Sequence, residues 1–203
     1  MRLFMSMRPL APVLILFLSL AAPLASPAAQ GPAEALVANL ANQAIPVLTR
    51  SDLPEAQREA KFRQLLHEGF DMNQIARLVL GRYWNQATPE ERAEFTKLLE
   101  NYLVQLYGDR FIGYRNVTFQ IQGSRDAGGD VIVNSVLLRP DGPPVALDWR
   151  VASAGGRSFV TDLVVEGVSM VITQRSEFAS VINQRGGRVE GLLQLLRQRT
   201  GAG

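Results

Sequence analysis

Residues 165–178 read VEGVSMVITQRSEF and join an alternating strand to a helix. The strand ends near Gly167, and apolar residues then recur three and four positions apart, which indicates a helix from about Val168. An apolar stripe at this spacing normally faces a core. We expect this stripe to comprise Val168, Val171, Ile172, Phe178, Ala179 and Ile182.

Arg175 falls on the same stripe. A buried guanidinium must be paired with an anion, because burying an unpaired charge is costly. Two interpretations remain open. Arg175 forms a structural pair with a sheet carboxylate such as Asp148 or Asp162, or it meets an anionic head group at the rim of an apolar pocket.

Four strands are predicted before the helix, and the last of them leads into this segment. Apolar and polar residues alternate over residues 117–122, 131–136, 145–151 and 159–166, as expected for strands with one buried face. The glycine pairs at 128–129 and 155–156 supply hairpin turns, and the Asp-Gly-Pro-Pro run at 141–144 supplies the third. The sequence therefore predicts a four-stranded antiparallel meander.

Helices are predicted on both sides of the sheet. Before it they cover about 33–48, 54–69, 71–81 and 88–108; after it, a last amphipathic helix follows Gly186-Gly187. Thr88, Pro89 and Glu91 form a capping-box start. Helices followed by strands and then helices predict an α+β domain, in which the sheet packs against N-terminal and C-terminal helices.

The first 29 residues have the composition of a cleavable export signal. Arg2 and Arg8 precede an apolar run at 10–20, and small residues follow it. An uncleaved membrane anchor is the alternative interpretation of this segment. Residues 30–203 then form a single domain. Cleavage removes Arg2 and Arg8 from the 21 basic residues and leaves 19 basic against 19 acidic residues. The basic pI of the whole chain therefore does not support nucleic-acid binding. Cysteine is absent, so disulfides do not stabilise this exported domain.

The residues of a catalytic site are largely missing. His67 is the single histidine and has no HExxH neighbour, and Val171 stands where a Gly-x-Ser-x-Gly elbow around Ser169 would need glycine. The carboxylates Asp148, Asp162 and Glu166 alternate with apolar residues, which predicts that they lie on the solvent-exposed face of the sheet. This position argues against a catalytic pair of carboxylates. We therefore expect no enzymatic activity and no cofactor.

The order of several motifs resembles the MlaC family, also called the toluene-tolerance auxiliary family. The motifs are Phe70-Asp71 with Ile75-Ala76-Arg77 and Leu80-Gly81, then Trp84, Thr88-Pro89-Glu90-Glu91 and Phe95, then Val164–Ser169 and Arg175–Phe178. The resemblance covers about 33–197. Gly81–Trp84 and the Phe178–Ile182 segment before Gly186-Gly187 are also similar to the hopanoid-associated HpnM branch.

The resemblance implies a periplasmic lipid shuttle with an apolar cavity between sheet and helices. The cargo would be a phospholipid or a hopanoid. The partners would be an inner-membrane ABC transporter complex and an outer-membrane lipoprotein complex, and we expect the carrier to be a monomer. A periplasmic adaptor that binds only proteins and an enzyme on a similar scaffold remain as alternatives.

The apolar faces of the predicted strands and helices indicate which residues line this cavity. The sheet side would supply Val133, Leu147, Trp149 and Leu163. The helices would supply Leu103, Leu106, Tyr107, Phe111 and Met170, whose flexible thioether suits a variable lipid chain. Arg175 is the head-group candidate at the rim.

Overall fold

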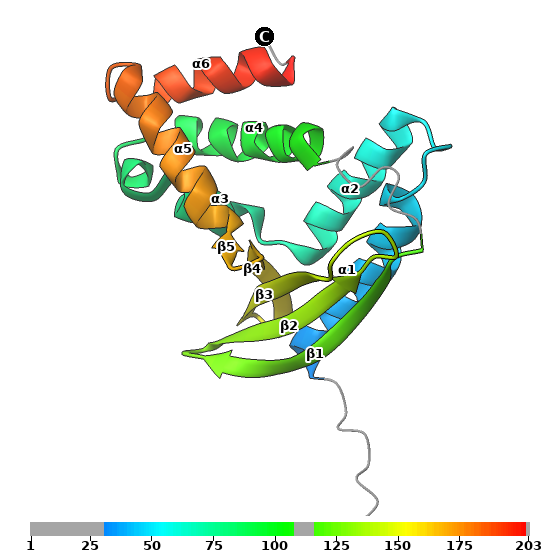
Figure 1. Ribbon diagram of the computed structural model, residues 1–203. Helices are drawn as coiled ribbons and strands as arrows, with labels where there is room; N and C mark the ends of the chain where they lie inside the picture. Colours follow the sequence, from blue (N-terminus) through cyan, green and yellow to red (C-terminus); the bar gives the residue numbers. More distant parts are fainter. Residues whose placement is uncertain (1–30, 108–115, 202–203) are drawn as a thin grey trace, which may run out of the picture.

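The computed structural model describes residues 31–107 and 116–201, which form one sheet and a set of helices (Figure 1). The helices are α1 (Pro32–Leu48), α2 (Glu55–Gly69), α3 (Met72–Leu80), the 3-10 helix η1 (Gly81–Asn85), α4 (Pro89–Tyr107), α5 (Met170–Gln184) and α6 (Val189–Thr200). The strands are β1 (Thr118–Ala127), β2 (Asp130–Leu138), β3 (Val145–Ala154), β4 (Arg157–Val165) and β5 (Val168–Ser169). The predicted α+β class is confirmed.

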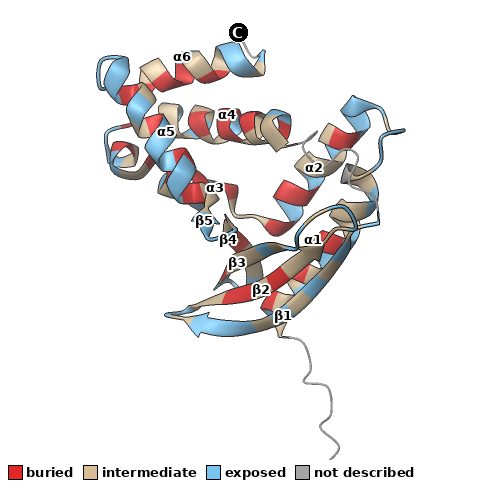
Figure 2. Cartoon of the chain, in the orientation of Figure 1, coloured by how far each residue is buried: buried red, intermediate tan, exposed pale blue. Residues whose placement is uncertain are grey.

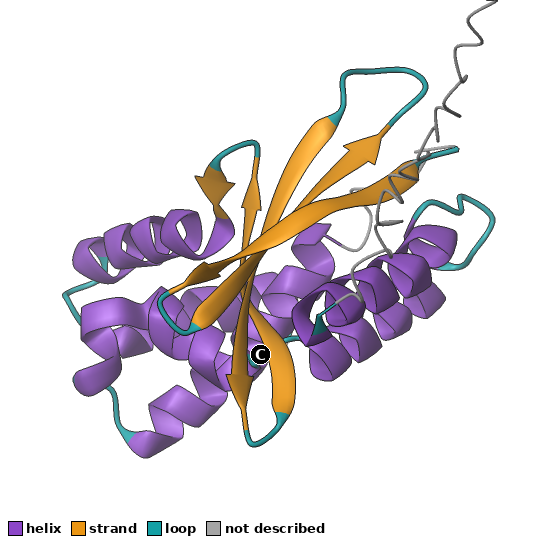
Figure 3. Ribbon diagram, turned by 90° about the horizontal axis from the view of Figure 1, so that it is seen from below, coloured by secondary structure: helices purple, strands orange, loops and turns teal. Residues whose placement is uncertain are grey.

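The strands pair antiparallel in chain order, as a meander. α1 lies along one face of the sheet, and α3 to α6 gather beyond one end of it (Figures 1 and 3). The reciprocal capping box at α4 is present: Glu91 N donates to Thr88 Oγ1 at 3.1 Å, and Thr88 N donates to Glu91 Oε2 at 2.8 Å. No helix within residues 31–107 and 116–201 is long and apolar enough to cross a membrane.

The prediction that a helix starts at Val168 is wrong. Glu166 and Gly167 both adopt positive φ, 49° and 79°, and this tight turn folds Val168–Ser169 back against β4 as a fifth strand. Ser169 then caps α5, because its Oγ accepts from Ile172 N at 3.1 Å. The helix therefore begins at Met170.

The buried face of α5 also differs from the predicted stripe. Val171, Phe178 and Ile182 are buried as expected, and Gln174 joins them. Val168 and Ile172 instead remain 52% and 62% exposed. Because Val168 lies outside the helix, the stripe that packs runs at 171, 174, 178 and 182, and it leaves Ile172 and Arg175 facing solvent.

The core of the described residues consists of two clusters. The helical cluster lies among α2 to α6 and contains Phe95, Leu99, Phe178 and Leu192 at its centre. The sheet cluster joins α1 to the sheet through Val37, Leu40, Val133, Val151 and Val160, with Leu65 of α2. Phe70 packs against both clusters, and it forms an isolated bridge with Val160. The fold is thus two apolar cores joined near β4.

An ion pair links α6 to α4, the two helices that pack in the helical cluster. Arg197 Nε and Nη2 donate to the two carboxylate oxygens of Glu94 at 2.6 and 2.8 Å. These hydrogen bonds hold the pKa of Glu94 below its usual 4.5. A carboxylate whose pKa is lower in the folded than in the unfolded state stabilises the fold at pH values above its unfolded-state pKa. This stabilisation is lost as the pH falls through the folded-state pKa.

We therefore expect Glu94→Gln to lower the free energy of unfolding at neutral pH but not in acid well below that pKa. The loss should be about 1 kcal/mol or less, because both side chains are about one third exposed. Urea unfolding at the two pH values measures it. An equal loss at both pH values would contradict the assigned role of the carboxylate charge.

Candidate functional site

The sheet presents a row of predicted site residues on the face that α1 covers. Val133 pairs with Trp149, and Trp149 pairs with Leu163, so three neighbouring strands place these side chains side by side. Leu147 lies on the same face of β3, two residues before Trp149, and pairs with Val165. Alternation in the sequence predicted this shared face correctly.

Hydrogen bonds fix the indole of Trp149 in this row. Its Nε1 donates to Ser135 Oγ at 2.9 Å, and that hydroxyl donates to the carbonyl of Leu147 at 3.0 Å. The ring of Phe119 meets the indole edge-on, with centroids 6.2 Å apart. The polar N–H is thus satisfied within the sheet, and the rest of the ring remains as apolar surface.

The helices supply a second group of apolar side chains. Leu103, Leu106 and Tyr107 lie half-buried in the last two turns of α4. The hydroxyl of Tyr107 donates to Met170 Sδ at 3.6 Å, which brings the end of α4 to the first residue of α5. Two segments that lie 63 residues apart in sequence therefore meet.

Some of these residues border one of the two cores. Leu103 and Leu106 pack against the helical cluster, and Trp149 packs against the sheet cluster. Among the described residues, Leu147, Leu163 and Met170 are half-buried yet belong to neither cluster. Figure 2 shows this intermediate burial along much of β3 and β4. We call the following set the apolar seam: Leu103, Leu106, Tyr107, Leu147, Trp149, Leu163 and Met170.

Three predicted site residues, Val133, Phe111 and Arg175, are not part of the seam. Val133 is fully buried in the sheet cluster, so it supports the row rather than presenting free surface. Phe111 lies outside the described residues. Phe119 was not predicted as a site residue, although it meets Trp149; its alternation with Thr118 and Gln120 was the signal that could have identified it.

Arg175 is exposed, contrary to the expectation of a buried cation. Its Nε donates to the carbonyl of Leu78 at 2.6 Å, and its side chain lies against Gly81, where an added Cβ would come within 3.3 Å of Arg175 Cδ. The predicted pair with Asp148 or Asp162 is replaced by other partners. Asp148 accepts from Asn134 Nδ2 at 2.7 Å, and Asp162 binds the start of α5.

Asp162 connects the sheet to the helix that carries Met170. One carboxylate oxygen accepts from the Ser169 hydroxyl at 2.5 Å, and the other accepts from Val171 N at 3.1 Å. Because Ser169 in turn accepts from Ile172 N, two side chains from different elements cap one helix end. This double cap sets the position of Met170 relative to β4.

Asp162→Ala is therefore expected to lower the free energy of unfolding by about 1–3 kcal/mol, because it leaves the Ser169 hydroxyl and the Val171 amide without this acceptor. Chemical denaturation measures the loss. Asp162→Asn, which keeps one carbonyl acceptor, serves as the control and should lose less. Equal losses for alanine and asparagine would contradict the capping role.

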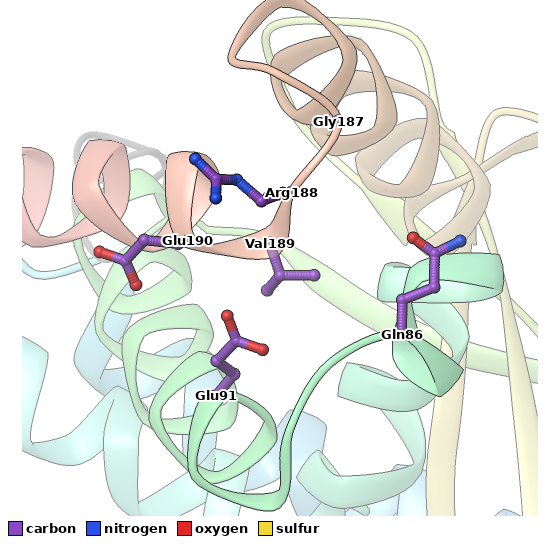
Figure 4. A pocket seen from close by; sticks show the side chains of 6 residues that line it. All are labelled: Gln86, Glu91, Gly187, Arg188, Val189 and Glu190. Atoms are coloured by element: carbon purple, nitrogen blue, oxygen red, sulfur yellow. The ribbon is translucent and has the colours of Figure 1, made fainter.

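Two pockets are formed elsewhere on the described chain, within the helical half. One lies between the first turns of α4 and α6 and is lined by Gln86, Glu91, Gly187, Arg188, Val189 and Glu190 (Figure 4). The other lies against Tyr102 and Phe178, with Glu177 and Arg199 at its edge. Neither includes a residue of the seam.

His67, the single histidine of the chain, serves a structural contact. His67 Nε2 lies 2.9 Å from Glu100 Oε2, and Arg63 Nη1 donates to Glu100 Oε1 at 2.6 Å, so this cluster ties α2 to α4. Within residues 31–107 and 116–201 no group of three His, Asp or Glu side chains is placed to hold a metal ion. The chemistry that the seam offers is apolar contact.

Comparisons with known proteins give related results. The model of the family described as MlaC protein matches residues 38–198. The intermembrane phospholipid transport system binding protein MlaC of Haemophilus influenzae is 26% identical over 113 residues, which are 53% of this chain and 53% of that protein. Toluene tolerance protein ttg2D of Pseudomonas putida is 23% identical over 110 residues, 54% of this chain and 51% of that protein. The chain thus spans about half the length of the curated relatives it matches.

A solved structure is similar over most of the fold. The phospholipid-binding protein from Ralstonia solanacearum, determined in complex with a phospholipid, superposes with a TM-score of 0.76 at 28% identity. The match covers 85% of this chain and 98% of that chain. A similar arrangement of sheet and helices therefore binds a phospholipid in that protein.

Proposed function

This chain belongs to the MlaC family, and from that premise we propose that it is a non-catalytic carrier whose apolar seam holds the acyl chains of a lipid. The observation that supports this most is the match to a phospholipid-bound protein over nearly all of that protein's length. The seam gives the proposal a physical basis, because it keeps large apolar side chains half-buried at the borders of the two cores or outside them.

The energetics explain why a lipid needs such a carrier. Each buried methylene contributes about 0.8 kcal/mol, so exposing two chains of ~14 methylenes to water costs on the order of 20 kcal/mol. Apolar side chains on both sides of the seam replace that water. Only the difference in free energy between the membrane and the protein then opposes transfer.

The proposed setting is the periplasm, reached through cleavage of a signal at residues 1–29. There the carrier would exchange lipid with an inner-membrane ABC transporter complex and an outer-membrane lipoprotein complex. The protein would act as a monomer without a cofactor, and Arg175 remains a proposed contact for a head group. These assignments follow the family and the sequence of the amino terminus.

Lipid extraction from the exported protein tests the cargo. The protein is purified from a host that makes both phospholipids and hopanoids, and the extract is identified by mass spectrometry. We expect a phospholipid at a constant ratio to protein. A hopanoid in its place would assign the chain to the hopanoid-associated branch, and an extract without stoichiometric lipid would contradict the carrier proposal.

A further inference from the structure

Met170 lies where β4, α4 and α5 meet. The residue before it pairs with β4, and the amide of the residue after it donates to Asp162 Oδ1 of β4 at 3.1 Å. From the end of α4, the hydroxyl of Tyr107 donates to the Met170 sulfur at 3.6 Å. The thioether is therefore held, half-buried, between two elements of the seam.

Sulfur is scarce in this chain. Cysteine is absent, and three of the five methionines lie within residues 1–29, so residues 30–203 contain only Met72 and Met170. Met72 is 9% exposed inside the helical cluster. Met170 is half-buried and, among the described residues, belongs to neither cluster. Because thioethers are among the side chains that peroxides oxidise most readily, the burial of the two sulfurs favours reaction at Met170.

The contact with Tyr107 suits the product of that oxidation. A thioether sulfur has two lone pairs, so one remains for an oxidant while the other accepts from the Tyr107 hydroxyl. The sulfur attacks one oxygen of hydrogen peroxide, the O–O bond breaks, and the proton on the transferred oxygen passes to the departing hydroxide, which leaves as water. The sulfur is oxidised by two electrons to a sulfoxide, and the peroxide is reduced. The sulfoxide oxygen is a stronger acceptor than the thioether and forms beside the same hydroxyl.

We propose that Met170 is a reversible oxidation site, at which a peroxide converts an apolar side chain of the seam into a polar one and so weakens lipid binding. The effect on lipid rests on the proposed function, in which acyl chains contact the seam. A chain that covers the sulfoxide must remove water from its oxygen, which is costly in an apolar site. A lipid already in the seam covers the sulfur, so the empty carrier is oxidised faster than the loaded one.

Timed exposure to hydrogen peroxide, followed by peptide mass spectrometry, tests the site. The exported protein is treated with its copurified lipid and after the lipid has been removed. In the lipid-free protein we expect Met170 to gain one oxygen about tenfold faster than Met72, and we expect lipid to slow the reaction at Met170 severalfold. Met72 is the internal control, because its place in the helical cluster makes its rate independent of lipid.

Lipid uptake then tests the consequence. Lipid-free protein is mixed with vesicles of equal parts phosphatidylethanolamine and phosphatidylglycerol, and native mass spectrometry measures the bound fraction. Complete oxidation of Met170 should weaken uptake roughly tenfold. Methionine sulfoxide reductases A and B with dithiothreitol should restore it, because two thiols become a disulfide and the sulfoxide oxygen leaves as water.

Matched variants assign this effect to one sulfur. Met170→Leu removes the thioether, so peroxide should leave the uptake of that variant equal to its own untreated value. Met72→Leu should keep the full peroxide effect. Met170→Gln introduces a polar side chain of similar length without any oxidant, and it should take up less lipid than Met170→Leu. Circular dichroism before and after treatment checks that the fold is retained.

Equal oxidation rates at Met72 and Met170 would overturn the site. Unchanged uptake by protein fully oxidised at Met170, a peroxide effect that persists in Met170→Leu, or loss of the fold on oxidation would overturn its effect on lipid. These results leave the carrier proposal intact, because cargo is measured independently by lipid extraction. Untreated protein that binds no lipid would contradict the carrier proposal and the effect on lipid together, whereas the two oxidation rates still decide the site.

Discussion

Leu163→Glu is expected to reduce the lipid that copurifies with the protein by roughly tenfold or more, because a carboxylate facing acyl chains must be buried without a partner. Leu163 is half-buried and belongs to neither core cluster, so the free energy of unfolding should fall by only about 1 kcal/mol. Native mass spectrometry measures the lipid-bound fraction, and thermal unfolding measures the stability.

Gln120→Glu is the matched control for this change. Gln120 is exposed on β1, on the face of the sheet opposite the seam. The substitution Gln120→Glu therefore introduces the same charge without contact with the proposed site. Leu147→Trp offers a second, uncharged test, since the larger ring would fill space in the seam. If folded Leu163→Glu or Leu147→Trp protein keeps its full lipid load, those residues do not contact the cargo.

Phe178→Ala is expected to lower the free energy of unfolding by about 3–5 kcal/mol, the largest stability effect that we predict. Phe178 is 3% exposed and meets the rings of Phe95 and Tyr102 edge-on, with centroids 5.9 and 5.7 Å apart. Its removal leaves a cavity where α4, α5 and α6 meet, and it removes two aromatic pairs. Urea unfolding gives the value directly.

Phe178→Leu is the control, because it preserves most of the volume and should cost much less. The two-cluster core adds a further expectation. Below its unfolding temperature, Phe178→Ala should still bind lipid, since Phe178 lies in the helical cluster and not in the seam. A loss below 1 kcal/mol would contradict the central position of Phe178 in that cluster.

Local patterns were enough to predict most of the elements. Alternation located β1 to β4, and the capping box at Thr88 and Glu91 placed the start of α4 correctly. β5 was missed because two residues are too few to show a period. The start of α5 was misplaced because it depends on the Glu166–Gly167 turn and on Asp162, whose carboxylate caps the helix from another element.

The site is harder to derive, since its features depend on contacts distant in sequence. Alternation predicted that Leu147, Trp149 and Leu163 share a face, and strand pairing bears this out. It could not separate Val133, which α1 covers, from Leu163, which remains half-buried, because both read as apolar strand residues. Arg175 is exposed because the packed face of α5 runs through Val171, Gln174 and Phe178, and its backbone partner Leu78 lies 97 residues away in sequence.

Native mass spectrometry of the intact exported protein tests the carrier proposal most directly. We predict that one lipid-bound species dominates, that its added mass matches a single membrane lipid, and that Leu163→Glu removes this species while Gln120→Glu retains it. A folded protein that carries no lipid after purification and takes up none from vesicles would contradict the proposal. That result would instead favour an adaptor that binds only proteins.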